Sequence, residues 1–221
     1  MDSAKRQELK KECRQIVNTV LKREIKNFSH PAVTVKHTKD AIKLIYKNYE
    51  PEEIDLYSGF RNLAIGELVR FQFGASIENG AIWDIFDKLE LSYVKPLENR
   101  IYTNAFTWSF SYGDSIETRS MILFERIKKE LLEPSIRILI GDINLIDDIL
   151  SGKVDGIFHP LTTILILCHI HGYDDEAMDS IVQKALSEWG KKYRRQTDAT
   201  QRKIDELRSK LRFSNPAICS S

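Results

Sequence analysis

The chain has 221 residues and an ordinary globular composition, with 42% hydrophobic and 29% charged residues. This balance excludes a chain that is disordered throughout and allows one substantial core. The formal net charge is only +1, but the first 27 residues hold eight Lys and Arg against four Asp and Glu, and residues 190–221 hold nine against three. The middle of the chain is therefore acidic. Basic ends on an acidic middle predict contact with an acidic partner.

The cysteines and the apolar runs predict the cellular location of the protein. Cys13, Cys168 and Cys219 are far apart and odd in number, so we expect no disulfide framework and a reducing setting. The richest apolar run, residues 164–168, is far shorter than the roughly 20 residues that a membrane span needs. No secretory signal is recognised at the N-terminus. We therefore expect a cytoplasmic protein with no membrane partner.

The first quarter of the chain reads as two helices joined by a short strand. Residues 3–28 carry apolar side chains at spacings of three and four, with Lys and Arg opposite, which predicts an amphipathic helix. Pro31 ends this helix, because proline lacks the amide hydrogen and disfavours helical geometry before it. Residues 32–37 alternate and predict a short strand. Residues 39–49 return to helical spacing through Ile42, Ile45, Tyr46 and Tyr49.

The next segments are expected to be helical up to an aromatic β element. Pro51 opens a short acidic helical turn, and residues 60–73 follow with apolar side chains at helical spacing. Residues 76–89 predict another helix. Residues 93–112 differ, because they are rich in aromatic and β-branched side chains. Within them, residues 105–112 alternate between apolar and polar side chains, as in a strand or hairpin arm.

Helices are also expected in the C-terminal half. Residues 115–132 and 134–150 show helical spacing. Residues 161–172 are ambiguous, because their β-branched side chains allow a buried strand, whereas Pro160 before them and a glycine at their end are the usual punctuation of a helix. We favour a buried helix. Residues 174–189 begin with three acids, which suit the positive end of a helix dipole.

These elements together predict a mainly α fold: a helix-dominated α+β protein with several helices around a single core and a small antiparallel β element around residues 93–112. The alternative is an α/β fold, since residues 136–140 and 161–170 could each form a buried strand.

After Gly190 the composition of the chain becomes strongly basic. We therefore predict a globular domain of residues 1–189 and a basic C-terminal helix or tail of residues 190–221.

The basic C-terminal part carries the strongest functional signal. An aromatic ring lies among four cations and is followed by a further basic stretch, which suits phosphate contacts with one stacked base. The residues predicted to contact nucleic acid are Lys191, Lys192, Tyr193, Arg194, Arg195 and Arg202. The alternative is a docking segment whose thin apolar stripe packs against a partner helix through Ile204, Leu207 and Leu211.

A second cluster offers metal ligands. Cys168, His169 and His171 are followed closely by Asp174, and imidazole and thiolate groups suit zinc or iron. On a strand the two histidines would share one face, whereas on a helix they would diverge by about 200°. Neither the H-E-x-x-H pattern nor a paired C-x-x-C pattern is present. No cofactor is firmly expected, and a divalent metal on His169, His171 and Asp174 is the alternative.

Two looser patterns bear on nuclease chemistry. Residues 8–10 and 24–26 match the Glu-x-Lys of restriction-type nucleases, but both lie on the first expected helix, where such residues are solvated surface. Arg23 and His30 have the spacing of an Arg–His pair in some helical ribonucleases, which chance often produces. Phosphate-binding glycine loops and a Gly-x-Ser-x-Gly elbow are absent from the sequence. Neither pattern identifies a family.

Three functions follow from these observations. The leading expectation is a cytoplasmic binding protein that engages an acidic partner, DNA or RNA, through its basic terminal helices. The enzymatic alternative is a metal-dependent hydrolase or nuclease that uses the cluster at Cys168, His169, His171 and Asp174. The third is a regulatory or structural subunit that binds another protein or a second copy of itself.

Overall fold

The structure is a computed structural model that describes residues 3–57, 67–91, 100–111, 113–154, 156–190 and 197–213. The chain divides into two units by its internal contacts. The first unit comprises Met1–Ser76 and Thr103–Ile136, and the second comprises Ile77–Tyr102 and Arg137–Ser221. The first unit is built on a β-sheet, whereas the second is mainly helical.

The described strands form one antiparallel sheet in the order β1-β2-β3-β4-β5. Sequence neighbours are therefore also neighbours in space. In the register, Val33 lies opposite Tyr46, Ile42 opposite Ile54, and Ile54 opposite Ala75. The strands are β1 (Val33–His37), β2 (Ala41–Tyr46), β3 (Glu52–Leu56), β4 (Glu67–Ile77) and β5 (Tyr102–Ser111).

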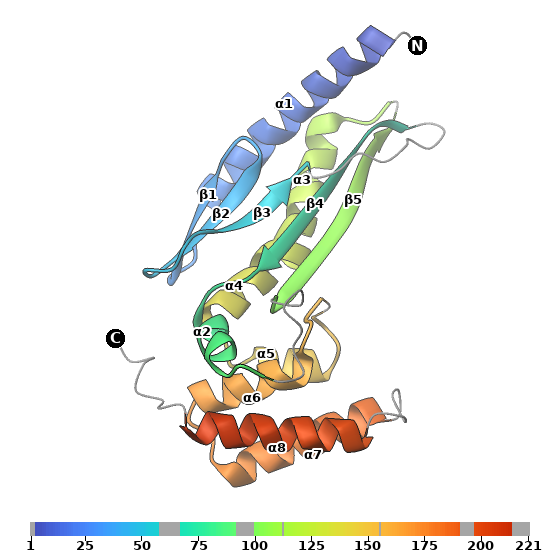
Figure 1. Cartoon of the computed structure of the whole chain (residues 1–221). Helices are drawn as coiled ribbons and strands as arrows, with labels where there is room; N and C mark the ends of the chain where they lie inside the picture. Colours follow the sequence, from blue (N-terminus) through green and yellow to red (C-terminus); the bar gives the residue numbers. More distant parts are fainter. Residues whose placement is uncertain are drawn as a thin grey trace. The chain divides into compact units, whose positions relative to one another are not determined.

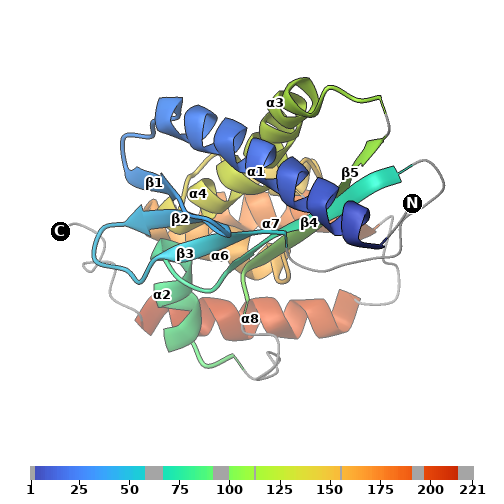
Figure 2. The same cartoon turned by 90° about the horizontal axis from the view of Figure 1, so that it is seen from above.

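Two helices cover one face of this sheet. Helices α1 (Ser3–Asn27) and α3 (Ile116–Ile127) pack against each other, and α1 also contacts β1; Figures 1 and 2 show both helices on the same side of the strands. Strand β4 supplies the apolar face beneath them, because every second side chain is buried: Val69, Phe71, Phe73, Ala75 and Ile77. Helix α1 contributes five buried side chains to the same core: Cys13, Val17, Val20, Leu21 and Ile25. The helix predicted over residues 3–28 and the strand predicted over residues 32–37 are thus confirmed.

The helix-dominated single-core prediction is wrong, because the β-sheet is much larger than a small element at residues 93–112. Residues 39–49 were expected to be helical, yet they contain β2, and the acidic turn after Pro51 is β3. In β2, Ile42, Leu44 and Tyr46 are buried together, which is a period of two. A short segment with adjacent apolar residues fits both periods. Pairing with β1 and β3 decides between them.

The rest of the correction concerns β4 and the alternative fold. The helix expected over residues 60–73 is β4 from residue 67 onward, and its earlier residues lie outside the described part of the chain. Gly74 lies inside that strand rather than ending a helix. The α/β alternative is also wrong, since the sheet is antiparallel and residues 136–140 and 161–170 are helical. The fold is mixed α+β, with a core in each of two units.

The second unit is organised around a buried helix. Helix α6 (Pro160–Ile170) buries every residue from Thr162 to Cys168, and the helices that contact it are α2 (Ala81–Lys88), α5 (Leu145–Leu150), α7 (Asp175–Gly190) and α8 (Thr197–Phe213). Pro160 occupies its first turn, as the sequence predicts. Between α3 and α6, the chain forms a π-helical turn η2 (Lys128–Leu132) and α4 (Glu133–Ile140) before α5. No described helix is both long and apolar enough to span a membrane.

Candidate functional site

The apolar stripe of the basic tail is used inside the protein. Ile204, Leu207 and Leu211 recur at spacings of three and four, so they share one side of α8. All three are buried, and α8 contacts α6. Burial of each such side chain stabilises a fold by roughly 1.5–3 kcal/mol. The partner helix that the docking alternative requires is thus present in the same unit of the same chain.

The basic residues in the second half of α8, Arg208, Lys210 and Arg212, have acidic or carbonyl partners. Arg208 forms an ion pair with Asp179, and Arg212 pairs with Asp175 at 2.7 Å, so α7 supplies both acids. Lys210 donates to the carbonyl oxygen of Glu90 at 2.5 Å and lies 3.5 Å from a carboxylate oxygen of Glu206. Exposed pairs of this kind contribute about 0–1 kcal/mol each. Their main consequence is that the far end of α8 presents little uncompensated positive charge.

The N-terminal end of α8 differs from its C-terminal end in how its positive charge is placed. Arg202 and Lys203 are exposed on α8. The preceding candidates, Lys191, Lys192, Tyr193, Arg194 and Arg195, lie outside the described residues. Residues 191–203 contain six cations and a single acid, Asp198. The positive charge of the tail is therefore concentrated before the anchored part of the helix.

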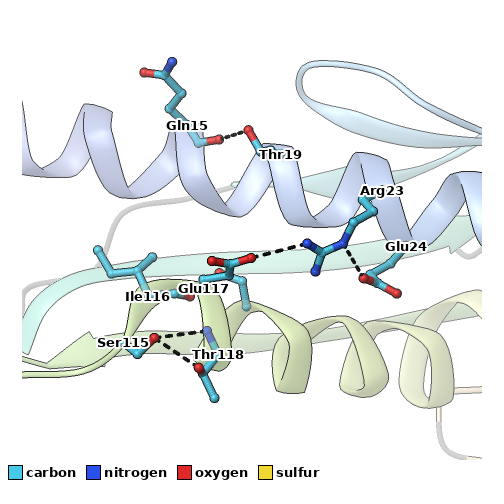
Figure 3. A network of polar contacts seen from close by, with 9 residues as sticks. Gln15, Thr19, Arg23, Glu24, Ser115, Ile116, Glu117 and Thr118 are labelled. Atoms are coloured by element: carbon cyan, nitrogen blue, oxygen red, sulfur yellow. Dashed lines mark hydrogen bonds and ion pairs between the residues drawn. The ribbon is translucent and has the colours of Figure 1, made fainter.

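The basic residues of the N-terminal helix are also engaged within the first unit. Arg14 forms an ion pair with Asp40 and stacks on the Tyr57 ring, with 4.5 Å between its guanidinium carbon and the ring centroid. Arg23 donates to Glu24 at 2.9 Å and to Glu117 at 3.3 Å, which ties α1 to α3 (Figure 3). Two of the cations that the sequence offered for an acidic partner thus have acidic partners in their own unit.

The possible Arg–His pair is not assembled in the structure. Arg23 is held by the two glutamates, whereas the Nδ1 atom of His30 accepts a hydrogen bond from the Ala32 amide at 3.2 Å. His30 therefore organises the turn that follows α1. The Glu-x-Lys tripeptides at residues 8–10 and 24–26 lie on α1, as expected for helix surface.

The predicted metal ligands belong to a helix end and to the start of the next helix. His171 follows the last residue of α6, and its Nε2 atom lies 2.8 Å from the carbonyl oxygen of Gly141, which requires the ring to donate there. Asp174 accepts from the Ala177 amide at 2.8 Å and so caps α7. His169 lies in the last turn of α6. Among the described residues, no three His, Cys, Asp or Glu side chains are placed to hold a metal ion.

Cys168 is an inert core residue in this arrangement. Its thiol is fully buried, and burial raises its pKa to about 11. A thiolate is the form that binds metals and attacks electrophiles. The position of Cys168 therefore favours packing over either kind of chemistry.

Sequence reasoning missed a ladder of cations and aromatic rings between α3 and β5. The Arg119 guanidinium lies 4.8 Å from the Trp108 ring centroid, and that of Arg126 lies 4.2 Å from the Phe106 centroid and 6.0 Å from that of Trp108. Glu130 holds Arg126 at 2.9 Å. Phe106 and Trp108 are two apart on a strand, and the arginines are seven apart on a helix. These two spacings could have indicated that the rings share one side of the strand and the arginines one side of the helix. That the two sides contact each other follows only from the packing of α3 on β5.

Comparisons with known proteins add no family. No family model, no curated protein and no solved structure matches this chain.

Proposed function

We propose that this protein is a non-catalytic nucleic-acid-binding protein whose contact segment is residues 191–203. Lys191, Lys192, Arg194 and Arg195 would contact phosphates, Tyr193 would stack on a base, and Arg202 would extend the contact onto α8. The observation that carries the proposal is the division of charge on the tail. Its downstream arginines are paired with α7, while Arg202 is exposed.

The anchoring of α8 supports this choice over the docking alternative. Ile204, Leu207 and Leu211 are buried in the second unit and have no apolar surface left to offer a protein partner. Their burial also gives the basic segment a fixed point of attachment immediately downstream. A polyanion that binds residues 191–203 therefore contacts a segment attached to a helix that is already fixed. Less conformational entropy of the protein is then lost on binding.

The metal-dependent hydrolase receives no corresponding support. His171 is engaged with Gly141, Asp174 caps α7, and burial raises the pKa of the Cys168 thiol. We therefore do not propose catalysis at this cluster.

The experiment that tests the proposal is a salt titration of binding, measured by fluorescence anisotropy with a labelled single-stranded RNA and a labelled DNA duplex. Contact with about five phosphates predicts a slope of log K against log salt of about −3.5 for a single strand and about −4.5 for a duplex. The quadruple variant Lys191→Gln, Lys192→Gln, Arg194→Gln, Arg195→Gln should weaken binding at least about 100-fold at low salt.

The matched control removes four exposed lysines from the first unit: Lys26→Gln, Lys36→Gln, Lys39→Gln and Lys129→Gln. It changes the net charge by the same amount but should leave most of the affinity. Equal losses in the two variants would show that only total charge matters. Binding that is absent, or that does not change with salt, would also overturn the proposal.

A further inference from the structure

Two ion pairs join α7 to the C-terminal half of α8. Arg212 pairs with Asp175 at 2.7 Å, and Arg208 pairs with Asp179. The two acids are four residues apart on α7, and the two arginines are four residues apart on α8. Residues four apart share one side of a helix, so the pairs form a ladder along the facing sides of the two helices. The earlier acid meets the later arginine, which means that the helices run in opposite directions.

The acidic side of α7 ends where this ladder ends. Further along the same side, at steps of four residues, α7 carries Gln183 and Ser187, which have no charge. Because the helices are antiparallel, these two positions lie toward the N-terminal half of α8, where Arg202 is exposed. The acids on this side of α7 are therefore matched to Arg208 and Arg212, and not to the part of α8 that belongs to the basic segment.

A carboxylate competes directly with a phosphate for an arginine. Both groups accept charge-assisted hydrogen bonds from the planar guanidinium group, often two at once. The Asp175 and Asp179 side chains are 60% and 58% exposed, and that of Arg212 is 64% exposed, whereas Arg208 is partly shielded. The ladder thus lies at the surface, where a polyanion bound to α8 would reach it. Any phosphate that approaches these arginines must displace a carboxylate first.

We propose that Asp175 and Asp179 occupy the guanidinium groups of Arg212 and Arg208 in place of phosphates, and so limit the nucleic-acid footprint to residues 191–203. This inference rests on the proposed function and concerns the regulation of the same site. The contact is autoinhibitory, because without the two carboxylates the footprint would extend along α8 by up to two phosphate contacts. Each further contact releases counterions, so affinity and salt dependence should increase together.

The test compares the wild-type chain with the double variant Asp175→Asn, Asp179→Asn in the anisotropy titration with labelled single-stranded RNA. The slope of log K against log salt should become steeper by about 0.7 for each freed arginine, and by about 1.4 if both bind phosphate. The affinity should rise about 10-fold or more at low salt. Circular dichroism should show unchanged helix content, because exposed ion pairs contribute little to stability.

Two further variants separate this mechanism from a general effect of charge. The control Asp87→Asn, Glu176→Gln removes two exposed acids from the same unit, and it should leave the slope unchanged and raise the affinity far less. The quadruple variant adds Arg208→Gln and Arg212→Gln to the two asparagine substitutions. It has the wild-type net charge and lacks the arginines that the acids are proposed to mask, so it should bind RNA like the wild type.

The outcomes distinguish this inference from the proposed function. Unchanged binding by the double asparagine variant, an equal gain in the control variant, or a gain that persists in the quadruple variant would each overturn the autoinhibitory role alone. A wild-type chain that does not bind RNA in a salt-dependent manner would overturn both.

Discussion

Arg137 donates from Nη1 to the Oδ2 atom of Asp148 over 2.6 Å, joining the end of α4 to α5. Its Nε atom donates to Asp142 at 2.6 Å, so one guanidinium fastens both carboxylates. The Arg137 side chain is 24% exposed, and the two acids are similarly shielded. This three-residue connection lies within the second unit and holds the turn between the last residues of α4 and helix α5.

Replacing Arg137 should therefore destabilise the second unit. Arg137→Gln leaves two partly buried carboxylates without their shared donor, and we expect a loss of about 2 kcal/mol in the free energy of unfolding. Arg137→Lys keeps the charge but cannot form the forked contact, so it should recover only part of that loss. Urea unfolding followed by circular dichroism measures both. Wild-type stability in Arg137→Gln would show that the connection contributes nothing.

The same connection predicts how stability depends on pH. The hydrogen bond from Arg137 lowers the pKa of Asp148. At Asp142 desolvation raises the pKa, but the hydrogen bonds from Arg137 and Asn144 together with the charge of the arginine more than offset it, so that pKa is lowered too. A depressed carboxyl pKa adds stability above its unfolded value, near 3.9, and this stability is lost as pH falls through the folded value. The wild type should lose its excess stability over Arg137→Gln below about pH 4. A difference that stays constant from pH 7 to pH 3 would contradict this.

Gly80 should not tolerate a side chain. Its φ is +103°, and a Cβ atom would lie 2.7 Å from the carbonyl oxygen of Leu139. Gly80→Ala should cost at least about 3 kcal/mol, from backbone strain and overlap together. Gly152 has a φ of +69° but open space around it, so Gly152→Ala should cost only about 1 kcal/mol. Thermal unfolding of the two variants compares them directly. Equal losses of stability in both would show that the contact with Leu139 does not matter.

The buried thiols should be unreactive in the folded protein. Burial raises the pKa of Cys13 to about 12 and that of Cys168 to about 11. In a Cys219→Ser background, Ellman's reagent at pH 8 should detect neither thiol within minutes in buffer, and both in denaturing urea. Rapid reaction of the native chain would show that one of these cysteines is accessible, and would reopen the question of metal binding at Cys168.

The sequence by itself determined the elements whose periodicity is long. In the helix predicted over residues 3–28, the apolar spacing continues for about five turns from Leu9 to Phe28, which cannot fit a strand, and β5 alternates over enough residues to exclude a helix. For residues 161–172 the punctuation by proline and glycine favoured a helix but left a buried strand open, and the structure places the buried helix α6 there. The spacing of Ile204, Leu207 and Leu211 likewise indicated an apolar stripe, although its partner was open.

Tertiary structure alone decided the short segments and the contacts. Ile42, Leu44 and Tyr46 face one way only because β1 and β3 supply backbone partners on either side of β2, and those hydrogen bonds lie between distant residues. The Arg208–Asp179 ion pair and the contact of Arg119 with the Trp108 ring likewise join different elements, which only tertiary packing brings together. Local spacing fixes which side of an element is apolar, but the neighbour that covers it is chosen by packing of the whole chain.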